Sequence, residues 1–404
     1  MSDLGAGLDN LVELTPTLAS LGWNDTHDTW ADAHLAATGA PGVRLDDPGR
    51  AQAVAVEETA LVRGRLARVS RGFTLVFTGG DALLAASGRT RLDVDEAPAT
   101  GDYALISDDP TDGPAIAAIS PRTSALRRRA AGRVPEPQVL ATNVDVVLVM
   151  HGLDREVNLR RLERQLVVAW DSGATPLVVL TKADTASDVE ATVAEVATIA
   201  PGVEVLASST KTGRQLDRIA DLFAPNRSVA MLGLSGVGKS SLVNALSEGM
   251  VQLTGEVRAT DQRGRHTTVT RDLIPLPGGG FVIDAPGVRE IGLWQAYDGL
   301  ALAFPEVAEA AERCRFADCE HGNEPGCAVR AGIESGAIAE RRLDHWRHLQ
   351  AELALQESQL EEFARRAESR DRADAENQRD QARPNRRSRQ GGGKGGRRGG
   401  RRRR

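Results

Sequence analysis

Residues 229–241 of this 404-residue chain read Val-Ala-Met-Leu-Gly-Leu-Ser-Gly-Val-Gly-Lys-Ser-Ser. The four apolar residues at the start predict a buried strand, and residues 242–246 continue with helical spacing. Between strand and helix lies a match to G-x-x-x-x-G-K-[ST] at every fixed position, which is the pattern of a phosphate-binding loop. The simpler alternative is a Gly-rich turn, and the flanking strand and helix argue against it.

This loop predicts contacts with phosphate and with a metal ion. Glycines let several backbone N–H groups point at one phosphate group, and the helix N-terminus adds partial positive charge. We expect Lys239 to reach the β- and γ-phosphates and Ser240 to hold Mg²⁺. The predicted loop residues are Gly233, Leu234, Ser235, Gly236, Val237, Gly238, Lys239, Ser240 and Ser241.

Composition indicates a globular chain with 41% hydrophobic and 26% charged residues. Because no apolar stretch reaches ~18 residues and no signal peptide is evident, we expect a soluble, cytoplasmic protein without a membrane partner. We also expect a monomer. The net charge of −6 hides a basic end: residues 383–404 hold eleven basic residues and no acidic one. An acidic body with a basic tail indicates that the tail contacts a polyanion, and the alternative is a solubilising tail.

The changing pattern along the chain predicts several units. Short β-rich runs between residues 50 and 120 suggest a small barrel, and alternating strands and helices between 141 and 295 predict a parallel sheet covered by helices. Arg63, Arg65, Arg68 and Arg71 either line a nucleic-acid face of the barrel or are solvated outward positions. The full expected division is a lead-in (1–49), the barrel (50–120), a basic linker (121–140), the α/β domain (141–295), a helical domain around the cysteines (296–350), a charged helix (351–382) and a disordered Arg/Gly-rich tail (383–404).

A second phosphate-site element follows the loop. Asp284 ends an apolar strand and precedes Pro286 and Gly287, so its carboxylate is expected to face Mg²⁺ and the Gly287 N–H to approach the γ-phosphate. Thr267 and Thr268 lie between the two elements, and we expect the Thr268 hydroxyl to complete the Mg²⁺ shell.

The residues predicted to recognise guanine precede the phosphate loop in the sequence. Asp184 can accept two hydrogen bonds from guanine N1–H and N2–H₂, a pair that adenine does not offer. The stem of Lys182 would cover the ring, and a backbone N–H of the segment that follows the next strand would serve guanine O6. The expected base-binding residues are Thr181, Lys182, Asp184, Ser209, Thr210 and Lys211. Ordinary small GTPases have the phosphate loop first, and a parallel sheet tolerates the relocated termini.

All three cysteines of the chain lie close together. Cys314, Cys319, His321 and Cys327 follow the spacing C-x₄-C-x-H-x₅-C, which offers three thiolates and one imidazole. Four such ligands fill a tetrahedral shell, so we predict one structural Zn²⁺; the alternative is a set of buried thiols beside a chance histidine.

Hydrolysis needs a group that positions water. The residue after Gly287 is Val288, which cannot hydrogen-bond, whereas Ras-like enzymes use a glutamine there. The nearest candidate in sequence is His266, and the alternative is an exposed loop histidine. The predicted catalytic residues are His266, Lys239 and Gly287.

The order of these motifs, the Arg-His-Thr-Thr loop at 265–268, the run from Asp284 to Glu290 and the cysteine cluster resemble the ribosome small subunit-dependent GTPase A family (RsgA, also called YjeQ). The resemblance covers roughly residues 50–350. It implies an N-terminal OB-fold, a circularly permuted GTPase domain and a C-terminal, mainly helical zinc domain. It also implies late maturation of the small ribosomal subunit, contact with its rRNA, and GTP hydrolysis stimulated by that subunit.

Two positions depart from the family's pattern. The family's guanine motif usually begins with Asn where this chain has Thr181, and its third switch threonine is Val269 here. The shorter Thr181 side chain is expected to lose a bond to the base or to the phosphate loop. A competing function is an RNA-binding assembly scaffold that uses GTP as a structural ligand, with vestigial hydrolysis; a P-loop kinase or ATPase is disfavoured by Lys182 and Asp184.

Overall fold

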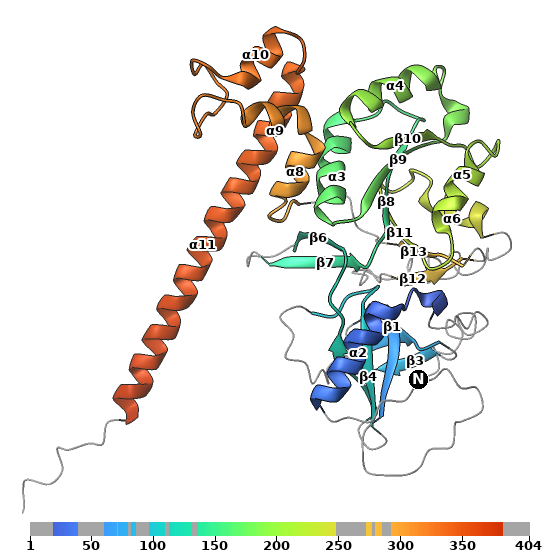
Figure 1. The fold of residues 1–404 in the computed structure, drawn as a ribbon, viewed down its shortest axis with the longest axis vertical. Helices are drawn as coiled ribbons and strands as arrows, with labels where there is room; N and C mark the ends of the chain where they lie inside the picture. The colour runs from blue at the N-terminus through green and yellow to red at the C-terminus, as the bar shows by residue number, and fades with distance from the viewer. Residues whose placement is uncertain are drawn as a thin grey trace, which may run out of the picture.

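The chain forms a β-rich N-terminal part, an α/β domain and a helical C-terminal part, coloured from blue to red in Figure 1. The computed structural model describes residues 19–38, 60–70, 72–79, 82–85, 97–109, 113–130, 136–247, 272–276, 279–284 and 292–382. Within these ranges no helix is long and apolar enough to cross a membrane.

The N-terminal part, called the barrel below, is a curved antiparallel sheet whose outer strands β3 and β5 approach each other, and a helix precedes it. Its elements are η1 (Ala19–Leu21), α2 (Asp25–Thr38), β1 (Ala60–Ser70), β2 (Phe73–Phe77), β3 (Ala82–Ala85), β4 (Tyr103–Asp109) and β5 (Gly113–Ile119). Strand β1 pairs with β2 and β4, β2 with β3, and β4 with β5, while β3 lies against β5. The segment predicted to be a lead-in (1–49) contains the helix α2. This helix packs on the strands, since Trp23 and Ala31 are buried in one cluster with Leu61 and Tyr103.

Three of the four barrel arginines, those that the structure describes, fit neither of the two expectations. Arg63 is buried and pairs with Asp28 and Asp32. Arg65 is fully buried, and its guanidinium donates to the carbonyl oxygens of Leu21, Gly101 and Asn143 and to the Ser228 hydroxyl. Arg65 and Arg68, which pairs with Asp272, therefore join the barrel to the α/β domain. Arg71 lies outside the described residues.

The basic linker expected at 121–140 is partly folded. It contributes β6 (Ala125–Arg129) and part of β7 (Pro137–Thr142), which form a two-stranded antiparallel sheet. The buried side chains of Leu126 and Leu140 anchor this hairpin in the main core. Apolar residues among the arginines were the sequence signal for this element.

The α/β domain is built on a sheet ordered β10-β9-β8-β11-β13-β12. Its elements are β8 (Val146–Gly152), α3 (Leu159–Asp171), β9 (Thr175–Thr181), η2 (Ala183–Thr185), α4 (Val189–Ile199), β10 (Glu204–Ala207), α5 (Leu216–Ala220), η3 (Asp221–Phe223), β11 (Ser228–Leu232), α6 (Lys239–Leu246), β12 (Asp272–Pro275) and β13 (Phe281–Asp284). All neighbours pair in parallel except β12, which is antiparallel to β13. Strand β11 lies between β8 and β13, in the interior of the sheet.

Both faces of this sheet are covered. Successive side chains of a strand point to opposite faces, so Val147 and Val149 of β8 belong to one core and Leu148 and Met150 to the other. Helices α3 and α4 cover one face and α5 and α6 the other (Figure 1). The alternation of strands and helices in the sequence is confirmed.

The C-terminal part is helical, with α8 (Tyr297–Ala303), α9 (Pro305–Ala311), α10 (Ala328–Glu334) and α11 (Glu340–Ala382). The charged helix expected from 351 starts earlier, because Leu343, Leu349 and Leu353 continue one buried stripe. Beyond that stripe α11 projects away from the body (Figure 1). Near the body Gln356 donates to the Leu293 carbonyl and accepts from the Gln295 N–H.

Candidate functional site

The phosphate loop lies at the carboxyl end of β11, where that strand turns into α6. Gly233 packs so closely on β8 that an added Cβ would lie 2.7 Å from the Met150 carbonyl oxygen. Gly238 has φ +99°, a conformation that L side chains rarely adopt. The Lys239 Nζ donates to the carbonyl oxygens of Gly233 and Leu234 at 2.7 and 3.0 Å, so the lysine already lies over the loop.

Thr181 joins this loop to the neighbouring segment that the sequence predicts to bind guanine. Its hydroxyl lies 2.5 Å from the Val237 carbonyl oxygen and 3.2 Å from that of His151. Thr181 is the last residue of β9 and is buried. Thr181 was expected to lose a bond to the base or to the phosphate loop, and a bond to the phosphate loop is present.

The Asp184 carboxylate is oriented by two neighbours. The Ser209 hydroxyl donates to Oδ1 at 2.7 Å, and the Lys211 Nζ lies 3.1 Å from Oδ2. The hydrogen bond from Ser209 and then the one from Lys211 lower the pKa of this carboxyl below its ordinary value. A carboxylate that is ionised at neutral pH can accept hydrogen bonds but cannot donate them, as recognition of guanine N1–H and N2–H₂ requires.

Lys182 is held by a residue that sequence reasoning missed. Its backbone is left-handed, with φ +57°, and its Nζ donates to Asp154 Oδ2 at 3.0 Å. The Lys182 hydrogen bond lowers the pKa of Asp154. The sequence did carry a signal, because Asp154 follows strand β8 and so lies at the same sheet edge as Lys182.

The predicted residues that follow strands gather at one edge of the sheet. Thr181 ends β9 and Lys182 follows it, Ser209 and Lys211 follow β10, and the phosphate loop follows β11. Thr210 is exposed beside Lys211. Leu234, Ser235, Gly236, Ser240 and Ser241 complete the loop and the first turn of α6.

The remaining predicted phosphate-site residues are only partly described. Asp284 is the last residue of β13, and its backbone is the register partner of Met231 in β11 and of Asp272 in β12. This register sets Asp284 beside the end of the strand that carries the phosphate loop. His266, Thr267, Thr268, Gly287 and Val288 lie outside the described residues.

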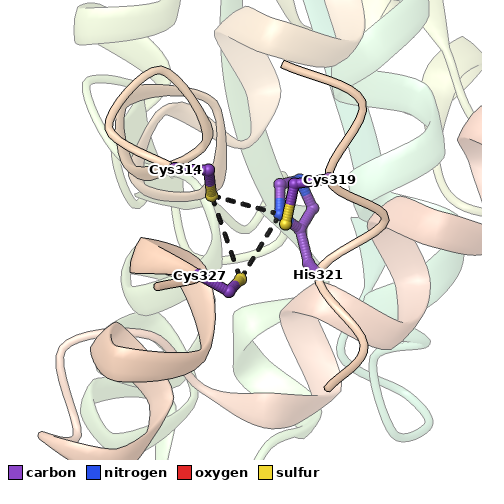
Figure 2. Close-up of side chains that lie close together, drawn as sticks. All are labelled: Cys314, Cys319, His321 and Cys327. Carbon is purple, nitrogen blue, oxygen red and sulfur yellow. Dashed lines mark hydrogen bonds between the residues drawn. The ribbon is translucent and has the colours of Figure 1, made fainter. Parts of the chain in front are cut away.

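The cysteine cluster is assembled as expected for a four-ligand metal centre (Figure 2). One ligand atom from each of Cys314, Cys319, His321 and Cys327 lies within 4.8 Å of the others. The Cys314 and Cys327 sulfurs are 3.9 Å apart, and they lie 3.5 and 3.6 Å from His321 Nδ1. A tetrahedral zinc with bonds of about 2.3 Å to sulfur places its sulfur ligands about 3.8 Å apart, so the cluster fits such an ion.

Residues of α11 and α10 hold this cluster in place. The Arg347 guanidinium donates to the carbonyl oxygens of His321 and Glu320, and the Trp346 ring lies 5.5 Å from that of His321. Cys327 caps α10 by accepting the Arg330 N–H at 3.4 Å. Outer contacts of this kind fix the orientation of ligating side chains.

Comparison with known proteins gives the same family. A family model described as RsgA GTPase matches residues 119–294. The small ribosomal subunit biogenesis GTPase RsgA of Streptomyces coelicolor is 42% identical over 340 residues, covering 83% of this chain and 86% of that protein. The small ribosomal subunit biogenesis GTPase RsgA 2 of Lactiplantibacillus plantarum is 38% identical over 309 residues, covering 76% and 87%.

Solved structures agree on the fold. The crystal structure of YjeQ from Thermotoga maritima has a TM-score of 0.55 at 25% identity, covering 73% of this chain and 99% of that one. YloQ, described as a circularly permuted GTPase, has a TM-score of 0.53 at 23% identity, covering 73% and 95%.

The sheet order, with the predicted guanine elements before the phosphate loop, thus defines a circularly permuted GTPase. More specifically, the chain belongs to the RsgA GTPase family. The expected family and the permuted GTPase fold are confirmed.

Proposed function

We propose that this protein binds GTP with Mg²⁺, hydrolyses it to GDP and phosphate, and acts in the biogenesis of the small ribosomal subunit in the cytoplasm. The observation that carries this proposal is the bond from Thr181 to the Val237 carbonyl, because it fixes the phosphate loop to the strand that leads into Asp184. The binding sites for the base and for the phosphates would then already lie at a fixed separation before one nucleotide binds to both.

Each part of the nucleotide has assigned residues. Asp184, oriented by Ser209 and Lys211, would accept from guanine, and the Lys182 stem would cover the ring. The loop N–H groups and Lys239 would bind the phosphates, with Ser240, Thr268 and Asp284 toward Mg²⁺. The ion would neutralise charge that develops on the transferred phosphoryl group.

Water activation is assigned to a group outside the phosphate loop. Val288 cannot orient water, so we assign this role to His266, with the Gly287 N–H approaching the γ-phosphate. A slow intrinsic rate and a higher rate on the small subunit are expected if docking brings His266 into place.

The flanking parts are assigned to the ribosome and to zinc. The order of β1 to β5, in which β3 lies against β5, supports an OB-fold, a barrel class that binds oligonucleotides. The three thiolates and one imidazole of the cluster support structural Zn²⁺ without an open position for catalysis. Binding of small-subunit rRNA is assigned to the barrel, the zinc region and the basic residues of 383–404.

Phosphate release from GTP, measured with and without purified small subunits, tests this function. We expect slow release alone and faster release with subunits, and GTP but not ATP should compete for binding of a labelled guanine nucleotide. No release above background in either condition would favour an assembly scaffold that uses GTP as a structural ligand. Equal competition by ATP would contradict guanine recognition through Asp184.

A further inference from the structure

Strand β12 of the α/β domain is held by a residue of the barrel. On one side β12 pairs with β13, and on the other side it meets β1, where Asp272 is the register partner of Arg68. The Arg68 guanidinium donates twice to the Asp272 carboxylate, from Nε to Oδ1 at 2.5 Å and from Nη2 to Oδ2 at 2.7 Å. Two parallel bonds of this kind fix direction as well as distance.

The position of this pair relative to the nucleotide site is set by strand register. Asp272 is the register partner of Asp284, the last residue of β13, which in turn lies opposite Met231 of β11. Arg68, Asp272 and Asp284 therefore lie in one row that crosses the sheet from the barrel toward the end of the phosphate-loop strand. In sequence, Asp272 also follows Thr268 by four residues.

The Arg68–Asp272 ion pair is partly shielded from solvent. The Arg68 and Asp272 side chains are 26% and 21% exposed, so water and salt screen the pair less than an exposed one. The hydrogen bonds with Asp272 also raise the pKa of Arg68, so this side chain stays charged at any pH used for assay.

The two neighbouring arginines of β1 have other partners. Arg63 binds Asp28 and Asp32 of α2, which stays within the N-terminal part. Arg65 binds carbonyl oxygens and the hydroxyl of Ser228, at the opposite end of β11 from the phosphate loop. Of these three arginines, Arg68 alone pairs with a carboxylate of the α/β domain.

We propose that Arg68 is a positioning residue for GTP hydrolysis, which couples RNA bound to the barrel to the Mg²⁺ side of the nucleotide site through Asp272. The inference rests on the proposed function, in which the barrel binds rRNA and Asp284 faces Mg²⁺. Arg68 touches neither nucleotide nor metal in this scheme. Arg68 holds Asp272, the first residue of β12. A movement of the barrel when it binds the subunit therefore moves β12 and, with it, the row of residues that ends at Asp284.

The test uses the full chain with single and paired variants. Arg68→Met removes the charge and keeps much of the stem, and Asp272→Asn keeps the shape of the acceptor. The double variant Arg68→Asp with Asp272→Arg restores an ion pair of reversed polarity. Arg63→Met is the matched control, because it removes an arginine of the same strand whose partners lie in α2. Each variant is measured for labelled GTP binding, basal phosphate release and release with small subunits.

We expect Arg68→Met and Asp272→Asn to keep GTP affinity and basal release, and to lose about 2- to 30-fold of the subunit-stimulated rate, the range for one coupling contact. The double variant should recover part of that loss, and Arg63→Met should be stimulated like the wild type. Full stimulation of a folded Arg68→Met protein would overturn the inference, and so would a double variant no better than either single one. If the wild type itself shows no stimulation, the proposed function fails instead, so the two failures are distinguishable.

Discussion

Replacing Glu163 by Gln should weaken the attachment of α11 to the α/β domain. Glu163 lies on α3, and its carboxylate binds Arg342 Nη1 at 3.0 Å and lies 2.5 Å from His345 Nδ1. The side chains of Glu163, Arg342 and His345 are only 3 to 5% exposed. Glutamine keeps the volume and removes the charge, so it leaves no cavity to confuse the result.

The expected loss in the free energy of unfolding depends on the partners that Arg342 retains. Removing one partner of a buried ion pair destabilises by about 3–5 kcal/mol, because the other charge stays buried without compensation. Arg342 still pairs with Glu306 at 2.6 Å and donates to the carbonyl oxygens of Ile199 and Ala303. We therefore expect a loss near the lower limit, about 3 kcal/mol.

The neighbouring pair supplies the matched control. Arg164 of α3 binds Glu352 of α11, and these side chains are 25% and 34% exposed. Glu352→Gln changes the net charge by the same amount at the same interface, and should cost about 0–1 kcal/mol.

Urea denaturation of the two variants, followed by tryptophan fluorescence, measures the difference, since Trp170 and Trp346 lie on α3 and α11. With a slope of about 2 kcal/mol/M, Glu163→Gln should lower the urea midpoint by about 1.5 M. Equal midpoints for Glu163→Gln and Glu352→Gln would refute the reasoning that burial makes this pair important.

Four further predictions concern zinc, RNA, catalysis and pH. Elemental analysis should find one Zn²⁺ per chain, and Cys319→Ala should lose it together with the protease resistance of the C-terminal helices; a zinc-free wild-type protein would contradict the metal assignment. Deleting residues 383–404 removes eleven positive charges and should weaken RNA binding and flatten its salt dependence, whereas unchanged binding at low and high salt would support a solubilising tail. The variant His266→Ala should keep GTP binding and lose most of the subunit-stimulated phosphate release, roughly 10²-fold at the low end of acid–base assistance; wild-type stimulation would remove this histidine from the mechanism. Burial raises the pKa of Asp171 from 3.8 to about 6, so its contribution to stability is full below pH 3.8 and is lost as pH rises through about 6. The stability of Asp171→Asn relative to wild type, measured by thermal melting, should therefore be greater at pH 7 than at pH 5, and an equal difference at both values would contradict the shift.

Much of the α/β domain could be predicted from short stretches of sequence. The strand before Gly233 and the helix after Lys239 follow from local apolar spacing, and the glycines between them follow from backbone conformations that Gly adopts easily. The cysteine spacing likewise indicated a metal centre, because a set of ligands can be recognised from the sequence when its members lie close along the chain. The order of the motifs gave the permuted GTPase fold, since a parallel sheet keeps its neighbours when the termini move.

Other features depend on residues that are distant in sequence. Nothing local shows that Arg65 is fully buried, because its hydrogen-bond acceptors, from Leu21 to Ser228, come together only when barrel and α/β domain pack. Asp154 became a partner of Lys182 for the same reason. The hairpin of β6 and β7 was missed because its arginines outweigh the two leucines that anchor it.

The sequence by itself thus determined the family and predicted the phosphate-loop motif, the guanine motif and the metal-ligand set, since each depends on residue types at fixed short spacings. Tertiary structure alone decided that Thr181 reaches the Val237 carbonyl and that Arg68 faces Asp272. The physical reason is that a hydrogen bond needs its donor and acceptor within about 3 Å, and for residues far apart in the chain only packing and strand register bring them to that distance.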